Sequence, residues 1–316
     1  MTPEPPQLAI VVGTYNRLSQ LQDLLASIEA ETRRPYEVHV CDAGSTDGTI
    51  EWLRQKAAAD RRIQPVFQGE RRGQAAALNT VFTRLHTPWT CWLSDDNIVV
   101  NGGLDIAVAA LEADRELGMV GLKVRDLRGP FADAPYIGGI TGTGIININQ
   151  GVLPTPLLQA LGGFSEDFSD YGIDADLTTR VLLAGRAIAM TRRIAIHHNR
   201  NWEPQGTPGG DAVAGRNRRY KLLYMKLYGP VFGVPAGWLA ARALWKILRW
   251  LFPRALALDS PRPVFGRLVR DWHNMIAARF VSLREEMANG DSPIHLIQRC
   301  PPALARKAAA TGVPAP

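Results

Sequence analysis

Four short apolar runs, each followed by a segment with helical periodicity, constrain the fold of this chain most strongly. The runs cover residues 8–12, 36–41, 63–67 and 89–93. In the segments between them, apolar residues recur three or four positions apart, which is the spacing of one helix face. Strands that alternate with helices build parallel sheets through right-handed crossovers. The sequence therefore predicts an α/β fold, with a mostly parallel sheet and helices on both faces.

The intervening and later segments extend this pattern. We expect helices at 49–59, 74–85, 104–111, 156–161 and about 170–184, and strands at 119–124, 145–148, 187–190 and 194–196. Asp47 is the expected N-cap of the helix at 49–59. The glycine-rich stretch 130–144 lacks the Gly-Lys-Ser/Thr of a phosphate-binding loop, so we interpret it as a plain loop.

Four parts follow along the chain. Residues 1–7 are expected to be disordered, 8–210 to form one domain with halves at about 8–97 and 98–210, 211–295 to form a helical extension, and 296–316 to form a disordered tail. The Ala- and Pro-rich composition of the last residues is typical of disorder.

Residues 211–252 carry eight basic side chains against Asp211 alone, although the whole chain has a net charge of only +6. Arg242, Lys246 and Arg249 fall on one narrow stripe of a helix that is otherwise rich in tryptophan. Such a helix suits the interface of an anionic membrane, and equally a packing surface on the domain or on a partner subunit. Because the basic charge is regional, we expect no nucleic-acid partner.

The cysteines and the N-terminus indicate the compartment. Cys41, Cys91 and Cys300 are too few and too scattered for a disulfide framework or a zinc cluster. The N-terminus lacks the basic start of a signal peptide, and the apolar run after it is too short. We therefore expect a cytoplasmic protein, with peripheral attachment at the inner face of the cell membrane left open by the basic region.

Acidic residues follow predicted strands or open a predicted helix. Asp42 follows the second strand, Asp95 and Asp96 follow the fourth, and Asp174 and Asp176 open a helix. Ligands of such sheets bind beyond the carboxyl ends of the strands, and paired carboxylates suit Mg²⁺ or Mn²⁺. In isolation, Asp95 and Asp96 are also typical of a turn with a helix N-cap. Asp174 and Asp176 would point about 200° apart on a helix, so only one can face a substrate.

Transfer from a nucleotide sugar needs a nucleotide pocket, a metal for the departing diphosphate and a base for the attacking hydroxyl. These acids could contact the nucleotide, bind the metal and act as the base. Over about residues 8–200 the chain resembles the family 2 glycosyltransferases, whose fold is called GT-A. The resemblance rests on 11–17 (VVGTYNR), 42–49 (DAGSTDGT), 72–79 (RGQAAALN), 94–97 (SDDN), 162–168 (GGFSEDF), 171–177 (YGIDADL) with Arg180, and His197.

The resemblance implies an inverting transfer from a nucleotide-diphosphate sugar, first of all a UDP-sugar, to a hydroxyl of a glycan or glycolipid in cell-surface polysaccharide synthesis. The donor-binding residues that it implies are Thr14, Tyr15, Asn16, Arg17, Asp42, Arg72, Asn79 and Asp95.

The same resemblance implies the metal ligands and the base. Asp96 would be the principal carboxylate on Mn²⁺ or Mg²⁺, and His197, or less readily His198, would approach the same ion. Asp174 would be the general base. Asp176 would cap its helix or pair with a basic neighbour.

Three departures from the family pattern leave other functions open. Ala43 stands where a second acidic residue is frequent, Ile173 where Glu commonly precedes the base, and Gly13 where Pro is frequent. A catalytically silent nucleotide-sugar-binding or scaffold protein is therefore an alternative. A sugar nucleotidyltransferase would share the sheet and the acidic metal site, but residues 14–17 do not resemble its glycine-rich phosphate loop.

Overall fold

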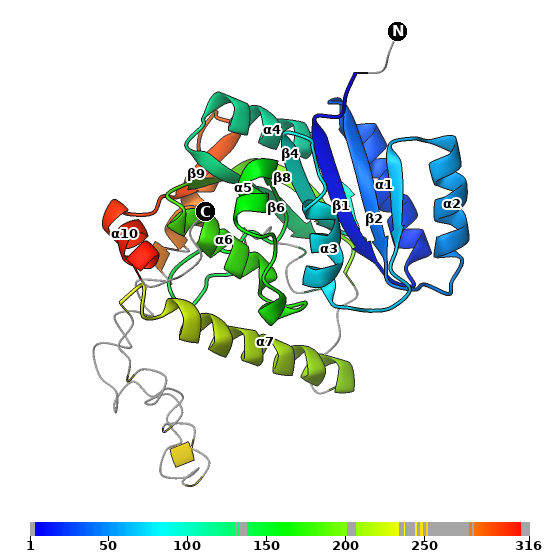
Figure 1. Ribbon diagram of the computed structural model, residues 1–316. Coiled ribbons are helices and arrows are strands. Elements are labelled where there is room, and N and C mark those ends of the chain that lie inside the picture. The colour runs from blue at the N-terminus through cyan, green and yellow to red at the C-terminus, as the bar shows by residue number, and fades with distance from the viewer. Residues whose placement is uncertain are drawn as a thin grey trace.

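A nine-stranded sheet runs through the centre of the computed structural model, with helices on both faces (Figure 1). The structure describes residues 4–129, 132, 138–200, 207–233, 237, 244, 247–248, 251, 278–279 and 281–310. The strands are β1 (Leu8–Thr14), β2 (Tyr36–Asp42), β3 (Ile63–Phe67), β4 (Trp89–Ser94), β5 (Asn97–Val99), β6 (Leu117–Asp126), β7 (Gly151–Pro154), β8 (Ala187–His198) and β9 (Ile294–Gln298). The predicted α/β class is confirmed.

The helices follow the expected periodicity closely. They are α1 (Leu18–Glu31), α2 (Thr49–Ala59), α3 (Gln74–Phe82), α4 (Gly103–Ala113), α5 (Thr155–Ala160), α6 (Ile173–Leu183), α7 (Pro208–Tyr228) and α10 (Pro302–Ala310), with a 3-10 turn, η1, at Glu166–Phe168. One buried cluster joins the sheet to α1 and α4, and a second joins it to α3, α5, α6 and α7. The apolar face of each helix therefore decides which side of the sheet it covers.

The strand order is β3-β2-β1-β4-β7-β6-β8-β5, with β9 paired to β8. β7 is antiparallel to both β4 and β6, and β5 and β9 are antiparallel to β8. The other six strands share one direction. Their carboxyl ends meet at one edge of the sheet, which brings Thr14, Asp42, Ser94, Asp126 and His198 to the same side.

Several predicted boundaries are wrong for identifiable reasons. Residues 145–148 form only an isolated antiparallel bridge, between Ile146 and Ile140, because Ile148 N already donates to the side chain of Thr178. The strands expected at 187–190 and 194–196 are one strand, β8. Gly48, at φ 91°, takes the N-cap position of α2, while Asp47 accepts from Thr49 N beside it.

The tail predicted to be disordered is ordered over much of its length. β9 pairs with β8, and Ile297 is buried against the sheet. α10 follows it and buries Ala308 next to α6 (Figure 1). The prediction for 296–316 is therefore wrong over 296–310. The predicted basic stripe of Arg242, Lys246 and Arg249 lies outside the described residues.

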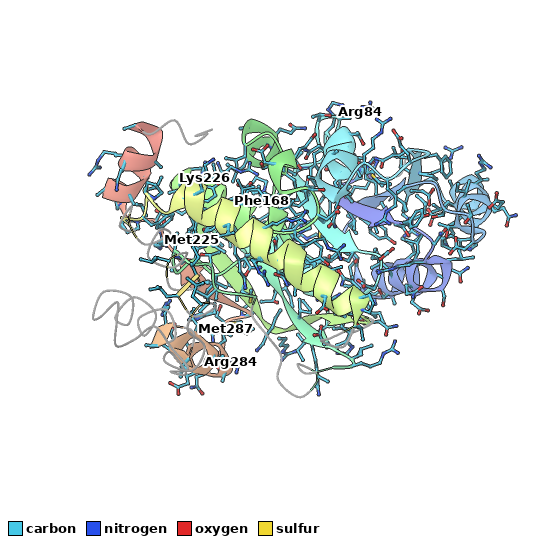
Figure 2. The ribbon with its side chains drawn as sticks, turned by 90° about the horizontal axis from the view of Figure 1, so that it is seen from below. Arg84, Phe168, Met225, Lys226, Arg284 and Met287 are labelled. Carbon is cyan, nitrogen blue, oxygen red and sulfur yellow. The ribbon has the colours of Figure 1, made fainter. Side chains whose placement is uncertain are left out.

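Helix α7 crosses the molecule beside α6 and is in front in Figure 2. Its apolar side carries Tyr224, Met225 and Tyr228, all buried. Tyr228 Oη donates to Asp176 Oδ1 at 2.5 Å, and Tyr224 Oη lies 2.6 Å from Thr179 Oγ1. These contacts fix α7 to α6, so the first part of the predicted extension packs on the domain.

Candidate active site

Asp95 and Asp96 occupy the tight turn between β4 and β5, and both are largely buried. No helix starts there: Asn97 Oδ1 accepts from Ser94 N and closes the turn. β5 then pairs with the end of β8, with Asn97 opposite His198. This short strand, which the sequence analysis did not predict, brings the carboxylates to a histidine about 100 positions later in the chain.

His198, rather than His197, faces Asp96. His198 Nε2 is 3.2 Å from Asp96 Oδ1, and its Nδ1 is 2.9 Å from Asp126 Oδ1. Successive side chains of a strand point to opposite faces, so His197 points away from this group. We call Asp95, Asp96, Asp126, Arg17 and His198 the acid cluster.

The charges of the acid cluster shift the pKa values of its members in different directions. Burial opposes the ionisation of Asp96, but His198 and Arg17 outweigh it, so the pKa of Asp96 is lowered. Burial also opposes the charge on His198, yet Asp126 and Asp96 raise its pKa to about 9. The pKa of Asp95 is raised, mainly because its carboxylate is buried. The cluster thus favours an ionised Asp96.

Asp95 is held from two sides by the loop that follows β1. Thr14 Oγ1 donates to Asp95 Oδ2 at 3.0 Å, and Arg17 Nη1 donates to Asp95 Oδ1 at 2.9 Å. The same Arg17 nitrogen is 3.1 Å from Asp96 Oδ2. The ends of β1 and β4, which are neighbours in the sheet, are therefore linked through side chains at its carboxyl edge.

The loops after β1 and β2 hold each other in place. Asn16, at φ 51°, donates its backbone N–H to Ser45 Oγ, and its Oδ1 accepts from Thr46 N at 2.7 Å. Asp42 Oδ1 accepts from Gly44 N and Ser45 N, whereas its buried Oδ2 has no hydrogen-bond partner in the part of the chain that the structure describes. Gly44 has φ 88°, and a Cβ there would lie 2.6 Å from Gly69 O, so the approach of the loop after β2 to the loop after β3 requires glycine.

Three of the donor-binding residues implied by the resemblance make contacts outside the acid cluster. Asn79 uses both ends of its amide on Phe164, donating to its O and accepting from its N, both at 2.8 Å. Arg72 is exposed and pairs with Glu70. Tyr15 is half-exposed beneath the Arg71 guanidinium. The contacts of Asn79 hold the Gly162–Phe164 turn, and its contact with a nucleotide stays a prediction.

Asp174 lies in the first turn of α6 and has mostly neutral neighbours. Its Oδ2 accepts from Asn147 Nδ2 at 2.8 Å, and Asn147 in turn donates to Asn149 Oδ1. Trp92 of β4 donates to Asn149 O, which ties this loop to the strand that carries the acid cluster. Burial raises the pKa of Asp174 more than the Asn147 hydrogen bond lowers it. The carboxylate is therefore a stronger base than an exposed aspartate.

Asp176, two residues later, has a different environment. Its Oδ2 pairs with Arg180 at 2.6 Å, and Arg180 also donates to Leu161 O and Gly163 O. Both side chains are almost completely buried. The predicted pairing of Asp176 with a basic neighbour is confirmed, and its oxygens are engaged in packing α6 against the glycine turn.

The donors for a divalent ion come from the acid cluster. Among the described residues, no group of three or more His, Cys, Asp or Glu side chains has the arrangement of a metal site. However, Asp96 Oδ1 is buried without a well-aligned hydrogen bond and faces His198 Nε2. A carboxylate oxygen and an imidazole oriented by a second carboxylate are a donor set that Mn²⁺ accepts. Asp96 and His198 are therefore the residues that could hold one.

The sequence analysis did not identify three residues near the predicted site, which are Asp126, Asn147 and Tyr220. Asp126 ends β6 at the same edge as Asp42, so an acid after a strand was the available signal. Asn147 lies in a loop and Tyr220 on α7, and no sequence pattern brings either to Asp174. A cavity of about 350 Å³, lined by Gly144, Ile146, Arg279 and 296–299, includes none of the predicted site residues.

Comparison with known proteins adds independent information. Residues 9–150 match the model of glycosyl transferase family 2. The N-acetylglucosaminyl-diphospho-decaprenol L-rhamnosyltransferase of Mycobacterium tuberculosis is 24% identical over 83% of this chain and 94% of its own length. A Bacillus subtilis protein named as a teichuronic acid biosynthesis glycosyltransferase, TuaG, is 29% identical over 31% of this chain. That match spans only 38% of the relative's length.

Solved structures show the same fold. The mannosyltransferase PcManGT of Pyrobaculum calidifontis, solved with GDP-Man and Mn²⁺, has a TM-score of 0.57 and covers 98% of this chain and 88% of its own. At 21% identity, this likeness supports the GT-A fold alone. The two relatives are named as a glycosyltransferase and a rhamnosyltransferase, and PcManGT is a mannosyltransferase solved with a nucleotide sugar.

Proposed function

We propose that this chain is a family 2 glycosyltransferase of the GT-A fold, which moves a sugar from a nucleotide-diphosphate sugar to a hydroxyl of a glycan or glycolipid, with inversion. The observation that carries the proposal is the acid cluster at the carboxyl edge, where ligands of such sheets bind. Among the described residues, buried Asp96 Oδ1 there has no well-aligned hydrogen bond and lies 3.2 Å from His198 Nε2. A buried polar atom without a partner is costly unless a ligand satisfies it.

The donor half binds the nucleotide part of the substrate. Asp42 Oδ2 is a second buried carboxylate oxygen, without a hydrogen bond to the other described residues, and it can accept from a ribose or base donor. The loop at 14–17, fixed by Ser45 and Thr46, borders the same edge. A UDP-sugar is the first donor to test, because Asp42 supplies an acceptor for the imide N–H of uracil.

Asp96 and His198 hold the divalent ion, Mn²⁺ or Mg²⁺, in this proposal. When bound, such an ion neutralises the charge that develops on the departing diphosphate. His198 donates its Nδ1–H to Asp126 in that state, which leaves Nε2 as a ligand atom. The lowered pKa of Asp96 keeps the carboxylate ionised for the same purpose.

Asp174 removes the proton of the acceptor hydroxyl. The acceptor oxygen forms a bond to the anomeric carbon while the bond from that carbon to the diphosphate breaks, and the proton moves to Asp174. Because burial raises the pKa of Asp174, it is a better proton acceptor at neutral pH than an exposed carboxylate. Asn147 donates a hydrogen bond to Asp174 Oδ2 and so fixes the orientation of the carboxylate.

The exposed side of α7 is proposed to contact an anionic membrane at its inner face, where a glycolipid acceptor would be reached. Leu222 and Leu227 are 47% and 40% exposed. Arg218, Arg219, Lys221 and Lys226 are exposed on the same helix. Apolar and basic side chains together suit a lipid interface. Among the described residues, no helix combines the length and apolar character needed to cross a membrane.

A donor panel with and without a divalent ion tests the proposed reaction. The protein, treated with a chelator and then supplied with Mn²⁺, should release nucleoside diphosphate from one nucleotide sugar and transfer its sugar to a glycan or glycolipid acceptor. Nuclear magnetic resonance of the product should show an inverted anomeric centre. Retained configuration, or full turnover in chelator, would contradict the corresponding part of the proposal.

Vesicle sedimentation tests the membrane contact separately. The protein should sediment with phosphatidylglycerol vesicles at low salt and be released at high salt, because exposed charges are screened. Replacing Lys221 and Lys226 with Gln should weaken this binding, whereas replacing Arg54, which is also exposed but lies on α2 at another face, should not. Unchanged sedimentation of the α7 variant would count against the contact.

A further inference from the structure

The guanidinium of Arg17 lies between the two carboxylates of the β4–β5 turn. Its Nη1 is 2.9 Å from Asp95 Oδ1 and 3.1 Å from Asp96 Oδ2. Among the residues that the structure describes, the Arg17 side chain makes no further hydrogen bond. One nitrogen therefore serves one oxygen of each of two neighbouring buried carboxylates.

Arg17 is the partner that can leave this arrangement. Its side chain is 46% exposed, whereas those of Asp95 and Asp96 are 7% and 10% exposed. Asp95 is also fixed through its second oxygen by Thr14. The backbone before Arg17 is held by the contacts of Asn16 with Ser45 and Thr46, so movement is confined to the long side chain. A change of rotamer would free both carboxylate oxygens.

A divalent ion held by Asp96 and the guanidinium of Arg17 would compete for the same carboxylate, the ion at Asp96 Oδ1 beside His198 and Arg17 at Asp96 Oδ2. Asp95 and Asp96 carry two negative charges, and Arg17 neutralises one of them. An ion bound to Asp96 would lie within a few ångströms of the guanidinium, and two positive charges at about 4 Å repel by several kcal/mol near a protein surface. The residue cannot keep its present position when the ion arrives.

We propose that Arg17 stands between Asp95 and Asp96 in place of the divalent ion until the donor binds, and that it then moves to the donor's diphosphate. Arginine suits this second position because its planar guanidinium binds phosphate oxygens in pairs. The inference rests on the proposed function and adds a coupling to it. Arg17 weakens the binding of the ion alone and strengthens the binding of the ion together with a nucleoside diphosphate.

Direct binding measurements test this coupling without any sugar transfer. Mn²⁺ binding to the full chain is followed by the electron paramagnetic resonance signal of free Mn²⁺, first alone and then with UDP. In Arg17→Gln and Arg17→Ala, Mn²⁺ alone should bind about tenfold more tightly, because a like charge beside the site is removed. UDP in saturating Mn²⁺ should bind about tenfold more weakly, because a charge-assisted phosphate contact is lost.

Two control variants separate the position of Arg17 from its charge. Arg84 is exposed near the end of α3, away from the acid cluster, so Arg84→Gln should leave both affinities unchanged. Arg17→Lys keeps a positive charge and should bind Mn²⁺ alone within about threefold of the wild type. Circular dichroism shows whether each variant is folded.

The outcomes distinguish this inference from the proposed function. If the wild type binds Mn²⁺ but Arg17→Gln and Arg17→Ala bind it no more tightly, the exchange is wrong while the metal site stands. If UDP affinity in Mn²⁺ is unchanged in both variants, the second position of Arg17 is wrong. If no variant and no wild-type sample binds Mn²⁺ with or without UDP, both the metal site and the exchange are overturned.

Discussion

Asp96 and Asp174 are both largely enclosed carboxylates, yet the acid cluster around Asp96 and the first turn of α6 around Asp174 surround them with opposite kinds of partner. Asp96 faces the cations His198 and Arg17, and its pKa is lowered. Asp174 faces the neutral amide of Asn147, and its pKa is raised. One region therefore stabilises a permanent negative charge, and the other makes a carboxylate that takes up a proton.

Of the substitutions at the acid cluster, Asp96→Asn should lower the rate of sugar transfer most. Removing its charge weakens Mn²⁺ binding, and the rate of sugar transfer should fall by about 10²- to 10³-fold, since the ion stabilises the departing diphosphate. The transfer rate, measured as a function of Mn²⁺ concentration, reports both the Mn²⁺ binding and the maximal rate. Asp23→Asn, on the exposed side of α1, is the matched control and should behave as the wild type. Full turnover by Asp96→Asn would remove Asp96 from the metal site.

Asp176→Asn tests whether Asp176, two residues after Asp174, stabilises the fold and takes no part in the chemistry. It removes the charged partner of Arg180 in a buried pair, so the free energy of unfolding should fall by about 3–5 kcal/mol. Urea unfolding measures the loss. If the variant is as stable as the wild type but fails in transfer, Asp176 rather than Asp174 takes part in the chemistry.

Asn79→Ala separates a structural contact from a donor contact. The change leaves Phe164 N and O without their partners, which should lower the free energy of unfolding by about 1–3 kcal/mol. UDP affinity in Mn²⁺, measured by calorimetry, should stay unchanged in the folded variant. A selective loss of UDP affinity with unaltered stability would place Asn79 in the nucleotide pocket.

Asn147→Ala should change the pH dependence of transfer with a smaller effect on its maximal rate. Asp174 acts as a base only when ionised, so transfer should rise with pH through its raised pKa and then level off. Asn147 lowers that pKa by donating to the carboxylate, so its removal should move the rising limb to higher pH. A limb that moves to lower pH, or does not move, would contradict the role of Asp174.

The sequence predicted the acid cluster around Asp96 better than the surroundings of Asp174. Apolar runs that end in acids located β2, β4 and their aspartates within two residues, because a buried strand leaves an unbroken apolar pattern. Choosing between His197 and His198 needed β5, a strand of three residues, and the register of β8, whose polar residues at 191–193 suggested a break. Short strands and register leave too weak a pattern in one sequence.

The surroundings of Asp174 depend on contacts that no local pattern records. The spacing on a helix showed that Asp174 and Asp176 face different ways, and the structure agrees, since only Asp176 pairs with Arg180. Asn147 comes from a loop that we predicted to be a strand and donates to Asp174. Burial, with a contribution from the nearby charge of Asp174, raises the pKa of Tyr220 on α7 to about 12. Tertiary packing alone brings these groups together.

The most direct test of two regions with separate roles is calorimetric titration of UDP with Mn²⁺ into Asp174→Asn, beside a transfer assay on the same sample. We predict UDP affinity within about twofold of the wild type and transfer lower by about 10²- to 10⁴-fold, the usual contribution of a general base. Transfer at the wild-type rate, or loss of UDP binding together with transfer, would contradict the account.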